Sequence, residues 1–135
     1  VTAATGGAAV LGAPLIHDFC LISLSDLLTP WEKIEKRIRG AAMADFVICL
    51  YNPSSRKRAD YLKKACEYIL EYQSPDTVCG YVRNIGREGE DAHILTLSEL
   101  KDTEVDMFTT VYISNSQTRN VDGKMVTLRG YRLEE

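Results

Sequence analysis

Two short loops could offer polar groups to a ligand, because each follows an apolar segment of strand length. Tyr51-Asn52-Pro53 follows the apolar run 46–50, and Asn84-Ile85-Gly86 follows the segment 77–83. In open α/β sheets, ligands bind outside the carboxyl ends of parallel strands, where the loops diverge and backbone groups are available. Asn, Pro and Gly are also the residues that tight turns require. From spacing alone, a ligand site and a pair of plain turns therefore both remain open.

Charged residues supply two further candidates. Arg56-Lys57-Arg58 falls in the expected first turn of a helix, after a cap at Ser54 or Ser55. Positive charge there opposes the helix macrodipole by about 0.3–1 kcal/mol per exposed residue. This cost favours a role for Arg56 and Arg58 in binding an anionic substrate, although a solvated basic turn is an equal alternative. Asp26, at the end of an expected strand, is a candidate catalytic carboxylate, but such a residue more often caps or turns the chain.

The 135 residues give little indication of other kinds of catalytic or binding site. The two histidines, His17 and His93, have no ligand-spaced Cys or carboxylate partners, so we expect no metal site. The sequence contains no nucleophile elbow, P-loop or dinucleotide fingerprint. A net charge of −3 argues against nucleic-acid binding, and the longest apolar runs are too short to cross a membrane. The four cysteines form no Cys-x-x-Cys pair, which predicts buried thiols and a cytoplasmic location, and no secretory signal is expected.

The hydrophobic periodicity predicts an α/β fold. The spacing of Trp31, Ile34, Ile38 and Ala42 predicts an amphipathic helix that ends near residue 44. Thr29-Pro30-Trp31-Glu32 predicts its start, with Thr29 and Glu32 as a capping box. The other expected helices span 2–11 and the segment from after residue 54 to about residue 72, with a helical turn at 98–100. The expected strands span 19–24, 46–50, 77–83, 94–97 and 108–113, and a hairpin is expected at Asp122-Gly123. Because the run 46–50 lacks polar alternation, we expect a mixed, largely parallel-core sheet flanked by helices.

Several long motifs, in order, resemble a known family. Segments 1–4, 11–15 and 17–19 resemble the middle of a tetrapyrrole methyltransferase. Segments 22–31, 50–58, 82–84 and 115–118 are similar to the precorrin-3B C17-methyltransferases of that family. The resemblance implies that residues 1–16 are the end of an N-terminal domain and an inter-domain helix, and that residues 17–135 are the C-terminal methyltransferase domain. It also implies a missing N-terminal domain as partner.

For the whole enzyme, the resemblance implies S-adenosylmethionine-dependent methylation of C17 of precorrin-3B, or its cobalt counterpart, with ring contraction in cobalamin biosynthesis. A polycarboxylate tetrapyrrole would pair with Arg56 and Arg58, and Asp26 is a candidate for acid–base help. Two alternatives stay open: a sister methyltransferase of the pathway, and a non-catalytic α/β fragment that is inactive without its N-terminal domain. A half-enzyme would expose an apolar domain face, which also favours a homodimer. The expected cofactor-binding residues are Thr2, Ala3, Tyr51, Asn52, Asn84 and Ile85.

Overall fold

The apolar runs of the chain lie in one five-stranded sheet. The structure is a computed structural model that describes residues 1–16, 18–54 and 59–128. The sheet has the strand order β2-β3-β6-β4-β5. Its strands are β2 (Phe19–Ser23), β3 (Val47–Tyr51), β4 (Val78–Arg83), β5 (Asp91–Thr96) and β6 (Thr109–Ile113).

The strand directions confirm a mixed sheet but correct the expectation of a largely parallel core. β2 and β3 are parallel, whereas the pairs β3–β6, β6–β4 and β4–β5 are antiparallel. An apolar run shows that both faces of a strand are covered, and this coverage does not determine the direction of its neighbours. Because β6 lies antiparallel between β3 and β4, those two strands run the same way and end at the same edge of the sheet.

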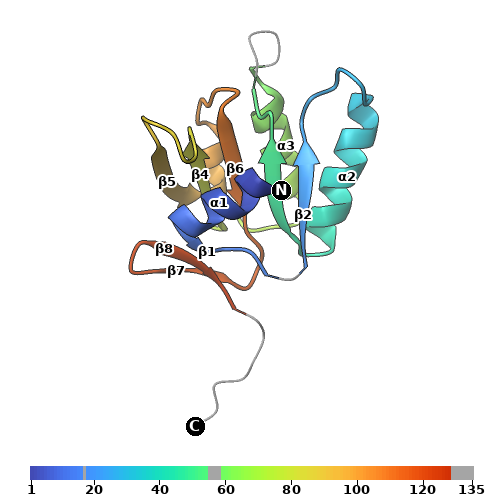
Figure 1. Cartoon of the computed structure of the whole chain (residues 1–135). Coiled ribbons are helices and arrows are strands. Elements are labelled where there is room, and N and C mark those ends of the chain that lie inside the picture. The colour runs from blue at the N-terminus through green and yellow to red at the C-terminus, as the bar shows by residue number, and fades with distance from the viewer. Residues whose placement is uncertain (17, 55–58, 129–135) are drawn as a thin grey trace.

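Helices cover both faces of this sheet (Figure 1). α1 (Thr2–Leu11) lies on one face, and α2 (Trp31–Met43), α3 (Tyr61–Leu70) and α4 (Leu97–Lys101) lie on the other. Successive residues of β3 therefore enter two different cores. Ile48 and Leu50 pack with α2, α3 and α4, while Cys49 packs with α1. This double coverage explains why β3 has no polar alternation.

A smaller three-stranded sheet closes the α1 side of the molecule. It consists of β1 (Gly12–Ala13), β8 (Lys124–Thr127) and β7 (Thr118–Val121), in that order. The predicted hairpin at Asp122-Gly123 is confirmed, with φ values of 51° and 79° that suit a tight two-residue turn. Met125 of β8 is fully buried in the core beneath α1, so the small sheet supports that helix.

Two helix starts differ from the sequence-based expectation. α2 begins at Trp31, and Pro30 is its N-cap. Among the described residues, no side chain caps this helix with a hydrogen bond, so the predicted capping box is wrong. The backbone at Pro30 is extended, with a ψ of 142°, so the helix begins one residue later than predicted. α3 begins at Tyr61 rather than after Ser54 or Ser55. The macrodipole argument for Arg56 and Arg58 therefore does not apply to its first turn, and both arginines lie outside the described residues.

The cysteine thiols are free and mostly enclosed by the two cores. Cys49, Cys66 and Cys79 are buried, as expected, while Cys20 is half-buried. Burial raises the pKa of Cys49 and of Cys66 to about 12, so these thiols stay protonated at neutral pH. No helix in the described part of the chain is long and apolar enough to cross a lipid bilayer.

Asp45 ties the turn between α2 and β3 to the loop after β6. Its Oδ1 accepts hydrogen bonds from the Ser116 N–H and from Gln73 Nε2, both at 3.0 Å, and its Oδ2 accepts one from Ser116 Oγ at 2.5 Å. Burial acts to raise the pKa of Asp45, but the bonds from Ser116 and Gln73 outweigh it and hold the pKa below its ordinary value. The ionised carboxylate therefore stabilises the fold.

We expect Asp45→Asn to lower the free energy of unfolding at pH 7 by about 1–2 kcal/mol, because charge-assisted hydrogen bonds are lost. The native state holds the lowered pKa, so the stabilisation is complete above about pH 4 and disappears as the pH falls through the native value. Urea unfolding at pH 7 and pH 3 measures the difference, with the exposed Asp76→Asn as control. An equal difference between wild type and Asp45→Asn at both pH values would contradict this assignment.

Candidate binding site

Two tyrosines fix the first turn of α1 across the sheet. The Ala4 N–H donates to the Tyr51 hydroxyl at 3.1 Å, which satisfies an amide that has no partner within the helix. The Tyr112 hydroxyl donates to the carbonyl of Ala4 at 2.6 Å and lies 3.1 Å from that of Ala3. Because Tyr51 is the last residue of β3, these bonds place the start of α1 beside the end of that strand.

An asparagine in the left-handed conformation follows two of the strands that end at this edge, β3 and β4. Asn52 follows β3 with a φ of 53°, and Asn84 follows β4 with a φ of 55°. Asn is one of the few residues besides glycine that tolerate this region. Asn52 Nδ2 donates to Ser23 Oγ at 3.0 Å, and Asn84 Nδ2 donates to the Gly89 carbonyl at 3.4 Å. The backbone therefore turns sharply in both loops, as the sequence predicts.

Ile85 brings the end of β4 against α1. A Cβ atom on Gly6 would lie 3.2 Å from Ile85 Cγ2, and one on Gly7 would lie 3.0 Å from Ile85 Cδ1. The two adjacent glycines therefore allow the isoleucine side chain to pack directly on the helix backbone. The start of α1, the end of β3 and the end of β4 converge on one edge of the sheet.

The convergence leaves a cavity of about 210 Å³, which we call the strand-end cavity. The Asn84 N–H donates to the Phe108 carbonyl at 3.2 Å, so the end of β4 holds one wall of it. Asp106 Oδ1 accepts from the Phe108 N–H and from Thr109 Oγ1, both at 2.9 Å, and fixes the turn that precedes β6. The described lining residues are Ala3, Tyr51, Asn52, Met107, Phe108, Thr109 and Thr110.

The described lining of the strand-end cavity is uncharged and combines apolar side chains with hydroxyl and amide groups. Burial raises the pKa of Tyr51, so the phenol stays neutral at physiological pH. Its oxygen already accepts from Ala4, and none of the described residues accepts its own proton, which can therefore bond to a ligand. The amide of Asn52 and the hydroxyl of Thr110 add donors and acceptors. This arrangement can bind and orient a neutral polar ligand.

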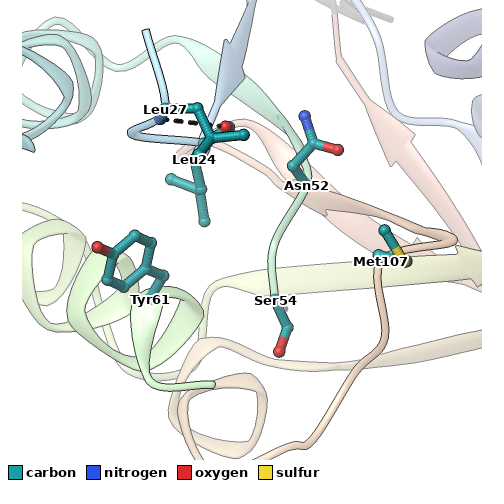
Figure 2. A pocket seen from close by; sticks show the side chains of 7 residues that line it. Leu24, Leu27, Asn52, Ser54, Tyr61 and Met107 are labelled. Atoms are coloured by element: carbon teal, nitrogen blue, oxygen red, sulfur yellow. Dashed lines mark hydrogen bonds between the residues drawn. The ribbon is translucent and has the colours of Figure 1, made fainter. Parts of the chain in front are cut away.

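A second cavity of about 250 Å³ adjoins the first, and we call it the aromatic cavity. It shares Asn52 and Met107 with the strand-end cavity. Figure 2 shows Tyr61 on the opposite side from these two residues, with its hydroxyl turned away from both. The described lining residues are Leu24, Ser25, Leu27, Asn52, Ser54, Tyr61 and Met107.

Asp26 lies behind the aromatic cavity and holds its tyrosine. The Tyr61 hydroxyl donates to Asp26 Oδ2 at 2.6 Å, a short, charge-assisted geometry. The Tyr61 ring also packs on Trp31, with ring centroids 4.2 Å apart. The candidate carboxylate of the loop after β2 is thus connected to α3 through an aromatic side chain.

The structure brings together most of the residues that the sequence singles out. Ala3, Tyr51 and Asn52 line the strand-end cavity, and Asn84 and Ile85 lie at the same edge. Thr2 is the exposed first residue of α1 and is not among the described lining residues. The roles of all these residues in cofactor binding stay predictions.

Sequence reasoning missed the segment 107–110 and Tyr61. The segment reaches the site because β6 inserts between β3 and β4 and begins at their carboxyl edge. No local pattern in the sequence indicates that insertion. Tyr61 sits on the first turn of α3, which the sequence placed several residues too early.

The chain is similar to known proteins along nearly its whole length. The family model for tetrapyrrole (corrin/porphyrin) methylases matches residues 1–101. The chain is 49% identical to a probable cobalt-factor III C(17)-methyltransferase of Salmonella typhimurium, over 98% of this chain and 55% of the relative. It is 44% identical to the precorrin-3B C(17)-methyltransferase of a Sinorhizobium species, over 90% of this chain and 48% of the relative.

A solved structure shows the same likeness in three dimensions. The crystal structure of the methyltransferase CobJ matches with a TM-score of 0.85 and 36% sequence identity, covering 95% of this chain and 54% of that one. The chain therefore spans about half the length of these relatives.

Proposed function

The chain belongs to the tetrapyrrole (corrin/porphyrin) methylase family, and on this premise we propose that it binds S-adenosylmethionine at the strand-end cavity. It would serve as part of a cytoplasmic enzyme that methylates C17 of precorrin-3B, or of its cobalt counterpart, with contraction of the macrocycle. The substrate is inferred from the names of the two relatives above.

The observation that carries the proposal is the convergence of α1, β3 and β4 on one edge. Ala3, Tyr51 and Asn52 line a single cavity, and Ile85 packs on the helix beside it. When bound, the cofactor supplies an electrophilic methyl group on its sulfonium. The chain need only hold the donor and the acceptor carbon in line, and positioning of this kind is worth about 7–11 kcal/mol in well-oriented reactions.

The residues present fit a nucleoside. The Tyr51 hydroxyl, the Asn52 amide and the threonine hydroxyls match the hydroxyl groups of a ribose. The exposed Phe108 matches the flat face of a base, and Ile85 packs on α1 at the same edge of the sheet. Ligand pockets usually enclose about 300–1,000 Å³, whereas the strand-end cavity holds about 210 Å³. We infer that the other half of a protein of the relatives' length completes the wall.

Three further residues have proposed roles toward the substrate. Arg56 and Arg58 would pair with the carboxylate side chains of the tetrapyrrole, because a guanidinium binds a carboxylate in a bidentate geometry. Asp26 would assist proton transfer during ring contraction, since its carboxylate lies behind the cavity that adjoins the cofactor cavity.

Calorimetry with S-adenosylhomocysteine tests the proposal, first on the chain and then on the chain with the N-terminal domain of a relative. We expect saturable binding at one site, at least about tenfold tighter in the pair because both walls then contact the ligand. Binding in the pair alone would still support the site and would identify the isolated chain as an inactive fragment. Absence of binding in both would refute the proposal.

Product analysis separates the C17 enzyme from a sister methyltransferase. With a carbon-13-labelled methyl donor, NMR of the product should show one new labelled methyl group on C17. A labelled methyl on another ring carbon would reassign the reaction within the same family.

A further inference from the structure

We propose that the aromatic cavity is the subsite for the conjugated face of the methyl-accepting tetrapyrrole, with Tyr61 as a positioning residue held by Asp26. This inference rests on the proposed function. It assigns the tetrapyrrole to the aromatic cavity and gives Asp26 the role of holding Tyr61, which differs from proton transfer.

The position of the aromatic cavity is the first argument. It shares Asn52 and Met107 with the strand-end cavity, so ligands in the two cavities would lie side by side. Methyl transfer requires reacting atoms about 3–3.5 Å apart. An acceptor for a donor bound at the strand ends must therefore lie directly beside that donor, and this cavity is in the required place.

The lining chemistry is the second argument. Leu24 is fully buried at the floor, while Leu27 and Met107 are 73% and 58% exposed at the mouth. Large exposed apolar side chains around a hollow are typical of a binding surface. Ser25 and Ser54 add hydroxyl groups to the lining. A flat conjugated ring with polar substituents matches this combination of an apolar wall and scattered hydroxyls.

The orientation of Tyr61 is the third argument. Its hydroxyl is engaged by Asp26 at 2.6 Å and is turned away from Asn52 and Met107 (Figure 2). The side chain therefore offers its ring to the cavity, and its ring packs on Trp31 as well. The Trp31 indole in turn donates to the Tyr68 hydroxyl at 3.0 Å. Asp26 and Trp31 together hold the ring in one orientation, which reduces the entropy lost when a planar ligand packs against it.

The fluorescence of a single tryptophan can report ligand binding in the aromatic cavity. Trp31 is the only tryptophan of the chain, and it contacts Tyr61 directly. Quenching of its emission by uroporphyrin III, a stable polycarboxylate tetrapyrrole, gives a dissociation constant for the full chain. S-adenosylhomocysteine binding is measured on the same samples by calorimetry.

Adjacent leucines provide a matched pair of variants. Leu27 lines the aromatic cavity, whereas Leu28, which is 98% exposed, is not among the described lining residues. We expect Leu27→Ala to weaken uroporphyrin binding by about threefold to tenfold, and Leu28→Ala to leave it unchanged. Neither substitution removes a buried side chain, so both variants should fold.

Variants of the Asp26–Tyr61 pair test the positioning role. We expect Tyr61→Ala to weaken uroporphyrin binding by about tenfold and Tyr61→Phe by much less, because the ring does the contacting. Asp26→Ala should weaken binding, and Asp26→Asn should restore it, since an amide oxygen also accepts the phenol hydrogen bond. All these variants should bind S-adenosylhomocysteine as the wild type does.

Two outcomes would overturn the inference without touching the proposed function. One is wild-type binding of S-adenosylhomocysteine with no binding of uroporphyrin. The other is unchanged uroporphyrin affinity in Leu27→Ala and Tyr61→Ala. If Tyr61→Ala fails to fold, the two leucine variants decide the matter. Absence of S-adenosylhomocysteine binding in the wild type, both alone and together with the N-terminal domain of a relative, would instead refute the proposed function.

Discussion

Ala3→Leu should reduce the affinity for S-adenosylhomocysteine by at least about tenfold while the chain stays folded. Ala3 is exposed on the first turn of α1 and lines the strand-end cavity. A leucine there would project into the space that the nucleoside is proposed to fill, and overpacking of this kind costs about 1–3 kcal/mol. Leucine is nearly as good a helix former as alanine, so α1 should be unaffected. Calorimetry on purified variants measures the loss.

Ala9→Leu is the matched control for this substitution. Ala9 is also exposed on α1, six residues further along, and is not among the described lining residues of either cavity. We expect it to bind the ligand as the wild type does. Equal affinities for Ala3→Leu and Ala9→Leu would show that the ligand lies elsewhere.

Gly7→Ala should destabilise the chain by about 2–3 kcal/mol, although alanine is normally preferred over glycine within a helix. The added Cβ would overlap the Tyr112 hydroxyl and lie 3.0 Å from Ile85 Cδ1. Tyr112 is fully buried and bonded to the carbonyls of Ala3 and Ala4, so its ring has no room to move. Helix α1 must shift, and we expect ligand affinity to fall together with stability.

Gly40→Ala gives the opposite sign and serves as its control. Gly40 lies inside α2, and a Cβ added there would meet no atom within 4 Å. We expect this substitution to raise the free energy of unfolding by about 0.5–1 kcal/mol. Urea unfolding of both variants checks the contrast. Stabilisation by Gly7→Ala would mean that α1 does not pack as closely as the structure shows.

The sequence predicts the elements well because their signals are local. α1 covers the predicted range 2–11, β3 differs from the predicted strand by one residue at each end, and the hairpin turns at Asp122-Gly123. The strand directions could not be predicted in the same way. Buried strands are apolar whichever way their neighbours run, so the antiparallel insertion of β6 between β3 and β4 left no trace in the local pattern.

The candidate site was predictable only where it depends on strand ends. Tyr51, Asn52 and Asn84 follow from the rule for carboxyl ends, and the rule still holds because β3 and β4 run in the same direction. Long-range contacts were beyond the sequence. The hydrogen bond from Tyr61 to Asp26 joins residues 35 positions apart, and that from Tyr112 to Ala4 joins residues 108 apart.

An NMR titration most directly tests whether one nucleoside contacts α1, β3 and β4 together. S-adenosylhomocysteine is added to the nitrogen-15-labelled chain, with the N-terminal domain of a relative in excess. We expect the amide signals of Ala3, Asn52 and Ile85 to shift together with a single dissociation constant. Shifts confined to the opposite edge, around Gln73 and Arg119, or no change at those three amides under saturation, would contradict the assignment.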